Sequence, residues 1–320
     1  MVEATNKNAG QPRNCSLDRP PKAEQVLQLD NCGCIITDET VSETLAKPNH
    51  SFSKLTHLSI VGAFDLSDAG LRLLVSSVKT LTRINISKCI SLTATALDIL
   101  ADSFGSTLEE LYMGNFNLID THRTLQALKR LKQVKLLSLA GIRDLSDGFI
   151  QDYIKERGRD LTTLVLKDCV NLTDVSMNSI SSVSRKLRTL DISNLGKLTD
   201  LSLEFVKIRL RGLTTLKLDH IPFSDKAIAV YLDYVAGENL EELSLNSNEN
   251  VGYLTAFSLG TCAEKLHTLD LSHYQNLTDR DVGMIVNGCS SLRTLTIVGC
   301  SKLTGDSLSG SDNLEIRHLG

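Results

Sequence analysis

The sequence predicts an α/β solenoid, in which stacked strand–turn–helix units share one parallel sheet on their inner side. A self-similarity of 26 or 27 residues runs from Leu55 to the end of the chain. Each unit opens with Leu-x-x-Leu-x-Leu and continues into a further Leu followed by Thr/Ser-Asp. A period in this range with this apolar spacing is typical of leucine-rich repeats. The ten units begin at Leu55, Leu81, Leu108, Val134, Leu161, Leu187, Leu213, Leu240, Leu266 and Leu292.

A degenerate unit precedes these ten, with Leu27, Leu29 and Cys32 at its fourth, sixth and ninth positions. Eleven units then cover about residues 24–310, and their stacking predicts a horseshoe like that of ribonuclease inhibitor. The expected organisation is a disordered polar tail over 1–23 and a repeat domain over 24–320. That domain divides into a capping unit over 24–54, repeats over 55–310 and a terminal strand over 311–320.

Residues 161–186 illustrate how one unit folds. Leu161, Leu164 and Leu166 are expected to point into the core from a short strand, because side chains alternate across a strand. Cys169 then turns the chain back over that core. Thr173 is predicted as a helix N-cap, with the following aspartate near the positive end of the helix dipole.

Two units lack the capping hydroxyl of the Thr/Ser-Asp pair. The third has Ile119-Asp120 in place of a capping hydroxyl, and the eighth has Val251-Gly252, which predicts an irregular convex side there. The step between the degenerate unit and the first regular one is longer, with a loop expected over 47–51.

Composition narrows the class of protein. Hydrophobic residues make up 42% of the 320, while a net charge of −4 and a pI near 6.0 argue against a chain that wraps nucleic acid.

Cys32, Cys89, Cys169 and Cys300 share the ninth position, where other units carry Ala, Leu, Ile or Asn. We therefore expect buried free thiols, a reducing compartment in the nucleus or cytoplasm, and no disulfide framework. No apolar run reaches membrane-spanning length.

The sequence lacks the motifs of common active sites. It has no Gly-x-Ser-x-Gly, no phosphate-binding Gly-Lys-Ser/Thr loop and no His-Glu-x-x-His. Cys32-Gly33-Cys34 has no partner pair at zinc or redox spacing. We therefore expect no enzymatic activity, no cofactor and no metal.

The concave sheet is the predicted functional surface, because the residues between the leucines stand out from the core there. Units six to nine are acidic on this face. A solvated sheet face and a docking surface for a basic or hydroxyl-rich protein segment both fit the pattern. A metal site of His220, Asp219, His273 and Asp270 is disfavoured, because units seven and nine lie about 10 Å apart. The candidate protein-binding residues are Arg188, Asp191, Lys217, Asp219, His220, Glu242, Asn246, Asp270 and His273.

The repeat type resembles the cysteine-containing leucine-rich repeats. Residues 169–174, Cys-Val-Asn-Leu-Thr-Asp, and 300–304, Cys-Ser-Lys-Leu-Thr, carry the likeness most clearly. That family includes F-box receptors of cullin–RING ubiquitin ligases, the mitotic-exit antagonists and the radiation-sensitivity repeat protein of nucleotide-excision repair. Residues 27–33, 71–77, 104–112 and 223–227 look most like plant relatives of the repair protein.

This resemblance implies a protein-recognition module, a substrate receptor or scaffold in cullin-type, SCF-like ubiquitin-dependent degradation with a link to DNA repair. The implied partners are a cullin or its adaptor and substrate proteins, bound by a monomer within a complex. We expect no F-box within the given sequence, since the 23 residues before the first repeat are too few and too polar, so a ligase contact would lie on the repeats or in a region that this sequence lacks. Two alternatives stay open: a direct damaged-DNA-binding repair factor, and a small-molecule receptor that uses the concave face.

Overall fold

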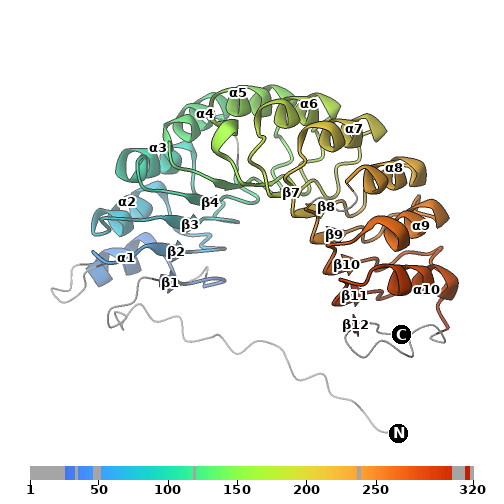
Figure 1. Ribbon diagram of the computed structural model, residues 1–320. Helices are drawn as coiled ribbons and strands as arrows, with labels where there is room; N and C mark the ends of the chain where they lie inside the picture. The colour runs from blue at the N-terminus through green and yellow to red at the C-terminus, as the bar shows by residue number, and fades with distance from the viewer. Residues whose placement is uncertain are drawn as a thin grey trace, which may run out of the picture.

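The computed structural model is an arch with strands along its inner side and helices along its outer side (Figure 1). It describes residues 26–32, 35–45, 52–117, 120–235, 239–304 and 314–317. Within them, twelve parallel strands form one sheet in sequence order, and each strand pairs only with its neighbours along the chain. The predicted α/β leucine-rich-repeat solenoid is confirmed.

The strands are three residues long and alternate with helices along the chain. They are β1 Val26–Gln28, β2 His57–Ser59, β3 Arg83–Asn85, β4 Glu110–Tyr112, β5 Leu136–Ser138, β6 Thr163–Val165, β7 Thr189–Asp191, β8 Thr215–Lys217, β9 Glu242–Ser244, β10 Thr268–Asp270, β11 Thr294–Thr296 and β12 Glu315–Arg317. The helices are α1 Asp38–Leu45, α2 Asp68–Ser76, α3 Ala94–Phe104, α4 Thr121–Arg130, α5 Asp147–Arg157, α6 Asp174–Val183, α7 Asp200–Arg209, α8 Asp225–Val235, α9 Tyr253–Cys262 and α10 Asp279–Gly288, with a short 3-10 helix at Gly158–Asp160.

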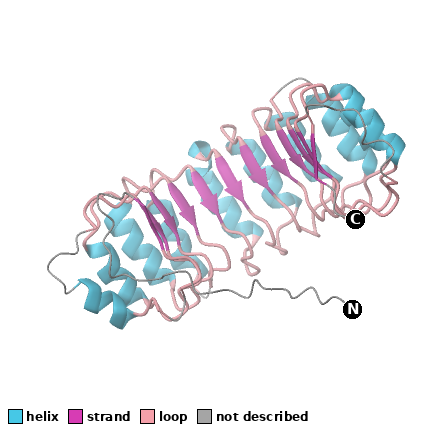
Figure 2. Ribbon diagram, turned by 90° about the horizontal axis from the view of Figure 1, so that it is seen from below, coloured by secondary structure: helices cyan, strands magenta, loops and turns pink. Residues whose placement is uncertain are grey.

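The repeat leucines hold the strands in register. Leu164 of β6 pairs with Leu190 of β7, and the same fourth position is paired along the whole sheet, so that Leu27 of β1 lies beside Leu58 of β2. Leu161, Leu164 and Leu166 are fully buried, as the alternation predicts. Because each unit covers the apolar side of the next, the core continues through the arch between sheet and helices (Figure 2).

The residue just before the ninth position has a left-handed backbone in every unit. Its φ lies between 53° and 74°, a region that favours Gly and Asn because a side chain crowds the backbone there. Where this position is not Gly or Asn, the residue accepts that strain. The eleven residues are Asn31, Gly62, Lys88, Asn115, Gly141, Asp168, Asn194, His220, Ser247, His273 and Gly299.

The ninth-position cysteines are donors as well as small apolar groups. The buried thiol of Cys169 donates to the carbonyl oxygen of Leu139 at 3.1 Å, one unit back, and Cys89 makes the same contact with Ile60. Asn248 fills this position with an amide that donates to the Leu218 carbonyl at 2.7 Å. A compact donor at this position therefore satisfies a carbonyl of the preceding unit, a contact that the apolar interpretation missed.

The expectation of free thiols holds for four cysteines and fails for one. Cys89, Cys169, Cys289 and Cys300 are free. Cys32 is disulfide-bonded.

Aspartates at the first helical residue connect seven of the helices to the unit that follows. Asp147 of α5 accepts hydrogen bonds from the backbone amide and the hydroxyl of Thr173, the N-cap of α6, at 3.0 and 2.7 Å. The sequence predicted the hydroxyl caps, which are confirmed, but not this contact between units. We call the series the aspartate ladder; its members are Asp38, Asp68, Asp147, Asp174, Asp200, Asp225 and Asp279.

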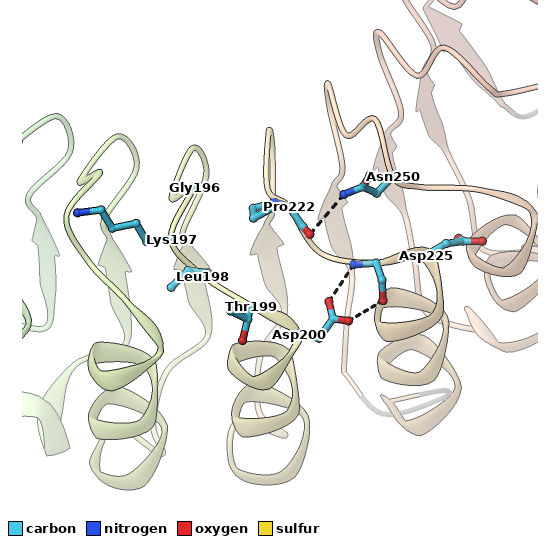
Figure 3. Close-up of a pocket in the computed structure, with 9 residues that line it drawn as sticks. Gly196, Lys197, Leu198, Thr199, Asp200, Pro222, Asp225 and Asn250 are labelled. Carbon is cyan, nitrogen blue, oxygen red and sulfur yellow. Dashed lines mark hydrogen bonds between the residues drawn. The ribbon is translucent and has the colours of Figure 1, made fainter.

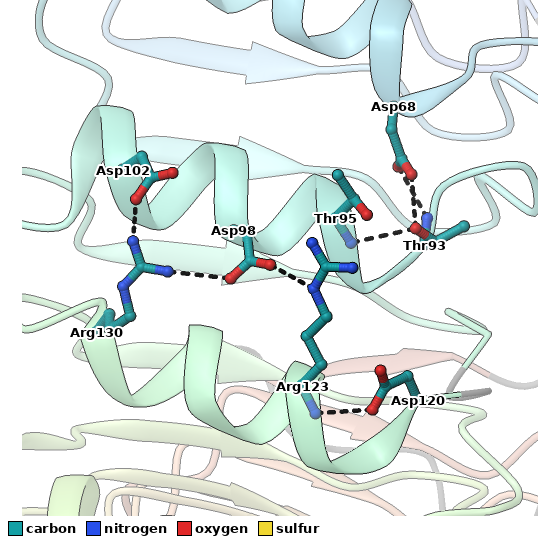
Figure 4. Close-up of polar contacts among 8 residues, drawn as sticks. All are labelled: Asp68, Thr93, Thr95, Asp98, Asp102, Asp120, Arg123 and Arg130. Atoms are coloured by element: carbon teal, nitrogen blue, oxygen red, sulfur yellow. Dashed lines mark hydrogen bonds and ion pairs between the residues drawn. The ribbon is translucent and has the colours of Figure 1, made fainter.

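The ladder is interrupted between α3 and α4, and other polar contacts join these helices (Figure 4). Ala94 occupies the ladder position of its unit. Asp120 caps α4 itself by accepting from the amide of Arg123 at 2.9 Å, so a carboxylate replaces the hydroxyl that the third unit lacks. Across the gap, Asp98 of α3 pairs with Arg123 at 2.6 Å and with Arg130 at 3.0 Å.

The eighth unit lacks a capping side chain and still forms a regular helix. Gly252 is the N-cap of α9 and has no side chain to offer. Instead Asp225 of the preceding unit accepts from the amides of Gly252, Leu254 and Thr255 at 2.8, 3.0 and 2.9 Å. The prediction of an irregular convex side was wrong, because the ladder supplies the missing acceptor.

Several expectations fall on residues that the structure does not describe. These are the tail over 1–23, the loop over 47–51, Ile119 and the segment 305–313. Near the end of the chain, β12 pairs in parallel with β11. Within the described residues, no helix is both long and apolar enough to cross a bilayer.

Candidate functional site

The candidate site lies on the inner face of the arch, over β7 to β10 (Figure 1). The register places Asp191, Lys217, Ser244 and Asp270 side by side, one from each strand. Two residues further along, where each strand has ended, a second row follows. We call the first set the strand row and the second the rim row; the rim row comprises Ser193, Asp219, Asn246 and Ser272.

Asp219 is at the centre of the rim row and is held from both sides. Its carboxylate accepts hydrogen bonds from the hydroxyl of Ser244 and from the amide of Asn246 at 3.1 Å, both on the next unit. Its own amide donates to the hydroxyl of Ser193 on the preceding unit at 3.2 Å. These contacts leave the side chain one orientation, so the carboxylate is preorganised.

The pKa of the Asp219 carboxyl is raised above its ordinary value. Burial is the main cause, and the negative charges of Asp191 and Asp270 add to it. The hydrogen bonds from Ser244 and Asn246 oppose the rise without cancelling it. Asp219 is therefore a carboxylate whose charge the protein only partly compensates.

The two flanking aspartates are fixed by backbone donors. Asp191 is buried and accepts from the amide of Ser193 at 3.0 Å. Asp270 accepts from the amide of Ser272 at 2.8 Å and lies 3.5 Å from the side-chain nitrogen of Asn246. All three aspartates thus face the same side of the sheet with neutral donors around them.

The cation of the strand row is already paired. Lys217 in the strand row lies 3.5 Å from Glu242, whose carboxylate also accepts from Thr215 at 3.4 Å. Within the described residues, none of the ion pairs involves Asp191, Asp219 or Asp270. These three aspartates therefore have no ion-pair partner among the described residues, although Lys167 lies at the ends of the same group of strands.

An open hollow of about 400 Å³ lies at the ends of these strands. It brings together three of the predicted residues with five others. Asp168, Asn194, His220 and Ser247 among them are left-handed residues, and that recurring Asn/Asp/Gly position was a signal in the sequence that could have marked them. The hollow is lined by Lys167, Asp168, Ser193, Asn194, Asp219, His220, Asn246 and Ser247.

The predicted histidines and arginine behave differently from one another. His220 and His273 are exposed in the turns after their strands and have left-handed backbones. Arg188 does not join the others: it precedes β7, and its guanidinium donates to the carbonyl of Gly212 at 2.9 Å. Across the described residues, no group of three or more His, Cys, Asp or Glu is arranged to hold a metal ion.

A larger hollow of about 760 Å³ lies elsewhere, between the turns that lead into α7 and α8 (Figure 3). The turn of the seventh unit contains Pro222 and is one residue shorter than that of the sixth. The carboxylates that line the hollow, Asp200 and Asp225, already accept from Ser224 and Gly252. The two aspartates of this hollow are thus already engaged in the aspartate ladder.

Comparison with solved structures shows the same fold in other proteins. A chain in the crystal structure of the yeast Rad7 and Elc1 complex matches with a TM-score of 0.57 and 16% identity, over 88% of this chain and 83% of that one. The leucine-rich-repeat-containing protein LegL7 from Legionella pneumophila matches with a TM-score of 0.54 and 13% identity, over 81% and 87%. At these identities the likeness concerns the fold, a leucine-rich-repeat solenoid. No family description and no curated protein matches the sequence.

Proposed function

We propose that the protein is a non-enzymatic recognition module that binds a basic segment of a partner protein over β7 to β10. The observation that carries this proposal is the group of three carboxylates on the same face, Asp191 and Asp270 of the strand row and Asp219 of the rim row, fixed by neutral donors. Half-buried carboxylates gain most from a cation, because a charge-assisted hydrogen bond is stronger than a neutral one. A lysine or arginine side chain meets that requirement.

The hollow beside Asp219 adds shape to this charge. Its hydroxyls and amides, from Ser193, Asn194, Asn246 and Ser247, can donate or accept around the head group of such a side chain. Preorganised partners reduce the ordering cost of binding. We infer that one basic side chain of the partner enters the hollow while its backbone follows the inner face.

In the cell, we propose that the protein acts as a substrate receptor or scaffold in cullin-type ubiquitin-dependent degradation linked to DNA repair. Two observations support this role: the cysteine-containing repeat consensus, and the shared fold with a chain of the yeast Rad7 and Elc1 complex. The partners would be a cullin or its adaptor together with a substrate protein, in the nucleus or cytoplasm. A direct damaged-DNA-binding role is less favoured, because the inner face is acidic where phosphates would have to bind.

The test is affinity purification of the tagged chain from its own cells under proteasome inhibition, followed by mass spectrometry. Wild type is compared with the double variant Asp219→Asn and Asp270→Asn, which removes charge with little change of shape. Asp144→Asn, an exposed aspartate in a turn of the fourth unit, is the matched control. We expect partners that the control retains and the double variant loses.

Each result bears on a separate part of the proposal. If the double variant and the control recover the same partner proteins, Asp219 and Asp270 are not part of the binding site. Absence of any cullin or adaptor among the recovered proteins would reject the ligase role and leave a binding module without it. A basic segment found in the lost partner should then bind the purified chain with an affinity that falls as salt increases.

A further inference from the structure

The outer face carries an apolar patch that the proposed function does not use. Of the fourteen large hydrophobic side chains that are exposed among the described residues, seven lie on the three consecutive helices α7, α8 and α9. Their exposed fractions run from 37% to 54%. We call this set the outer patch; it comprises Leu201, Ile208, Val230, Tyr234, Tyr253, Leu254 and Phe257.

Ion pairs join other outer helices, whereas these three helices expose apolar side chains beside their charged ones. Between α3 and α4, Asp98 and Asp102 pair with Arg123 and Arg130 (Figure 4), and α4 and α5 are joined by an ion pair of Lys129 with Glu156. Exposed apolar surface is costly on a soluble chain unless something covers it, so a concentrated patch marks an interaction surface.

Helix α9 lacks two features of the repeat at this patch, the capping hydroxyl and the ladder aspartate. Its ten residues include no charged side chain. Gly252 replaces the capping hydroxyl, and Tyr253 stands where the ladder has an aspartate. Tyr253 and Phe257 are 52% and 49% exposed, with ring centroids 6.1 Å apart. Loss of local stabilising features without a packing gain in the monomer is typical of a functional surface.

The charges on α8 point to a second copy of this chain as the partner that covers the outer patch. Lys226 is the second residue of α8 and Asp233 the ninth, both exposed. Seven residues apart, they lie two turns from each other on the same face of the helix, with Val230 between them. A second α8 laid antiparallel on this face brings each lysine to the partner's aspartate. The face is therefore complementary to itself in charge.

The flanking helices match under the same symmetry. Helix α8 lies between α7 and α9 (Figure 1). On α7, Leu201 and Ile208 are also seven residues apart, so Leu201 would meet the partner's Ile208. On α9, Phe257 lies midway between Leu254 and Thr261, near the symmetry axis, where it would contact its own copy. An isologous interface requires this kind of self-complementarity.

We propose that α7, α8 and α9 form the contact of a two-fold symmetric dimer, with the helices of the two copies antiparallel. The patch presents on the order of 500 Å² of apolar surface, if each large side chain contributes about half of what it can bury. A standard interface buries about 800 Å² per partner, so the polar rim must contribute and the dimer is weak. The inner face stays free, and the proposed recognition site is then doubled.

Sedimentation velocity of the full chain over a micromolar range of concentrations tests the dimer. The expected mass rises from 35.0 kDa toward twice that value as concentration increases. Leu254→Ser should keep the chain monomeric. Leu73→Ser on α2 is the matched control, because Leu73 is 43% exposed and Leu254 45%. The proposal would be overturned if wild type is a monomer at every concentration, or if Leu254→Ser and Leu73→Ser weaken dimer formation equally.

A charge exchange tests the arrangement itself. Lys226→Asp alone and Asp233→Lys alone should each weaken the dimer, because like charges then face each other. An equimolar mixture of the two variants should dimerise again, since each carries the charge that the other needs. Both changes suit the helix dipole, so folding is not impaired. A mixture that stays monomeric while wild type dimerises would reject the antiparallel arrangement, and association only with a different protein would reject a second copy.

Discussion

Asp174 accepts hydrogen bonds from both the amide and the hydroxyl of Thr199, at 2.9 and 2.6 Å, across the boundary between two repeats. Thr199 at the same time accepts from the amide of Leu201 and caps α7. One aspartate therefore orients the hydroxyl that starts the next helix. Stability in a solenoid depends on such nearest-neighbour interfaces, since each unit contacts only the next.

Removal of one ladder aspartate should destabilise the chain measurably. Asp147 accepts from the amide and hydroxyl of Thr173 and from the hydroxyl of Ser176, at 3.0, 2.7 and 2.5 Å. Because hydrogen bonds to a charged group contribute most, Asp147→Ala should cost about 2 kcal/mol in free energy of unfolding. Urea denaturation followed by circular dichroism measures the change.

Asp152→Ala is the control for that experiment. Asp152 lies on the same helix, exposed to solvent, and the substitution is chemically identical. It should change the free energy of unfolding by no more than a few tenths of a kcal/mol. Equal effects of the two substitutions would show that the ladder contributes nothing beyond helix propensity.

The pH dependence of stability should carry the signature of the ladder. Burial tends to raise the pKa of the Asp147 carboxyl, but the hydrogen bonds from Ser176 and Thr173 outweigh it, and the pKa is lowered. A lowered pKa in the folded state means stability that is present above the unfolded value, about 4, and lost as pH falls through the folded value. The difference in Tm between wild type and Asp147→Asn should therefore shrink below about pH 4.

The contribution of Asp219 to stability should depend on pH in the opposite direction to that of Asp147. Its folded pKa is raised, so the stability that its protonated form contributes is lost as pH rises through the folded value. Relative to the Tm of wild type, the Tm of Asp219→Asn should consequently be higher at neutral pH than at pH near 4. If both variants show the same trend with pH, the two environments do not differ as the structure indicates.

The fold was predictable because the information that specifies it is local and repeated. Leu161, Leu164 and Leu166 recur at fixed spacing, and a strand three residues long needs little more than this alternation to be recognised. The acidic side chains of the inner face could be predicted for the same reason. Asp191 and Asp270 occupy the same position of their units, so the parallel register places them in one row.

Contacts between units were not predictable from one unit's pattern. The partner of Asp174 lies 25 residues away, and only the stacked register brings them together. Arg188 was assigned to the inner face by its spacing, whereas its long side chain reaches the Gly212 carbonyl. His220 was read as a polar strand residue, while its backbone is left-handed and belongs to the turn.

The ninth-position thiols should be unreactive in the folded protein. Burial raises the pKa of Cys169 to about 12, so the thiol stays protonated and donates to the Leu139 carbonyl. The thiolate is the nucleophile, so alkylation at pH 8 should proceed only through opening of the repeat. Site-resolved mass spectrometry after iodoacetamide treatment gives the rate; the less buried Cys300 should react first. A Cys169 that reacts as fast as an unfolded-state thiol would contradict this.

The interruption of the ladder at Tyr253 should be coupled to Asp281. With tyrosine in the ladder position, Thr278 has no acceptor among the described residues of the preceding unit and instead forms a capping box. Its amide and hydroxyl donate to the buried carboxylate of Asp281 at 3.0 and 2.7 Å. Asp281→Ala should therefore cost about 1–2 kcal/mol, as loss of a helix cap does.

Restoring the ladder should make Asp281 less important. Tyr253→Asp places a carboxylate where Asp225 and Asp279 hold the caps of their neighbours, so Thr278 gains a second acceptor. In that background Asp281→Ala should cost less than it does in wild type. Urea denaturation of the two single variants and the double variant, at concentrations that keep the chain monomeric, gives the coupling energy. Strictly additive effects would mean that a carboxylate at position 253 does not reach Thr278, and that the ladder geometry does not extend to this repeat.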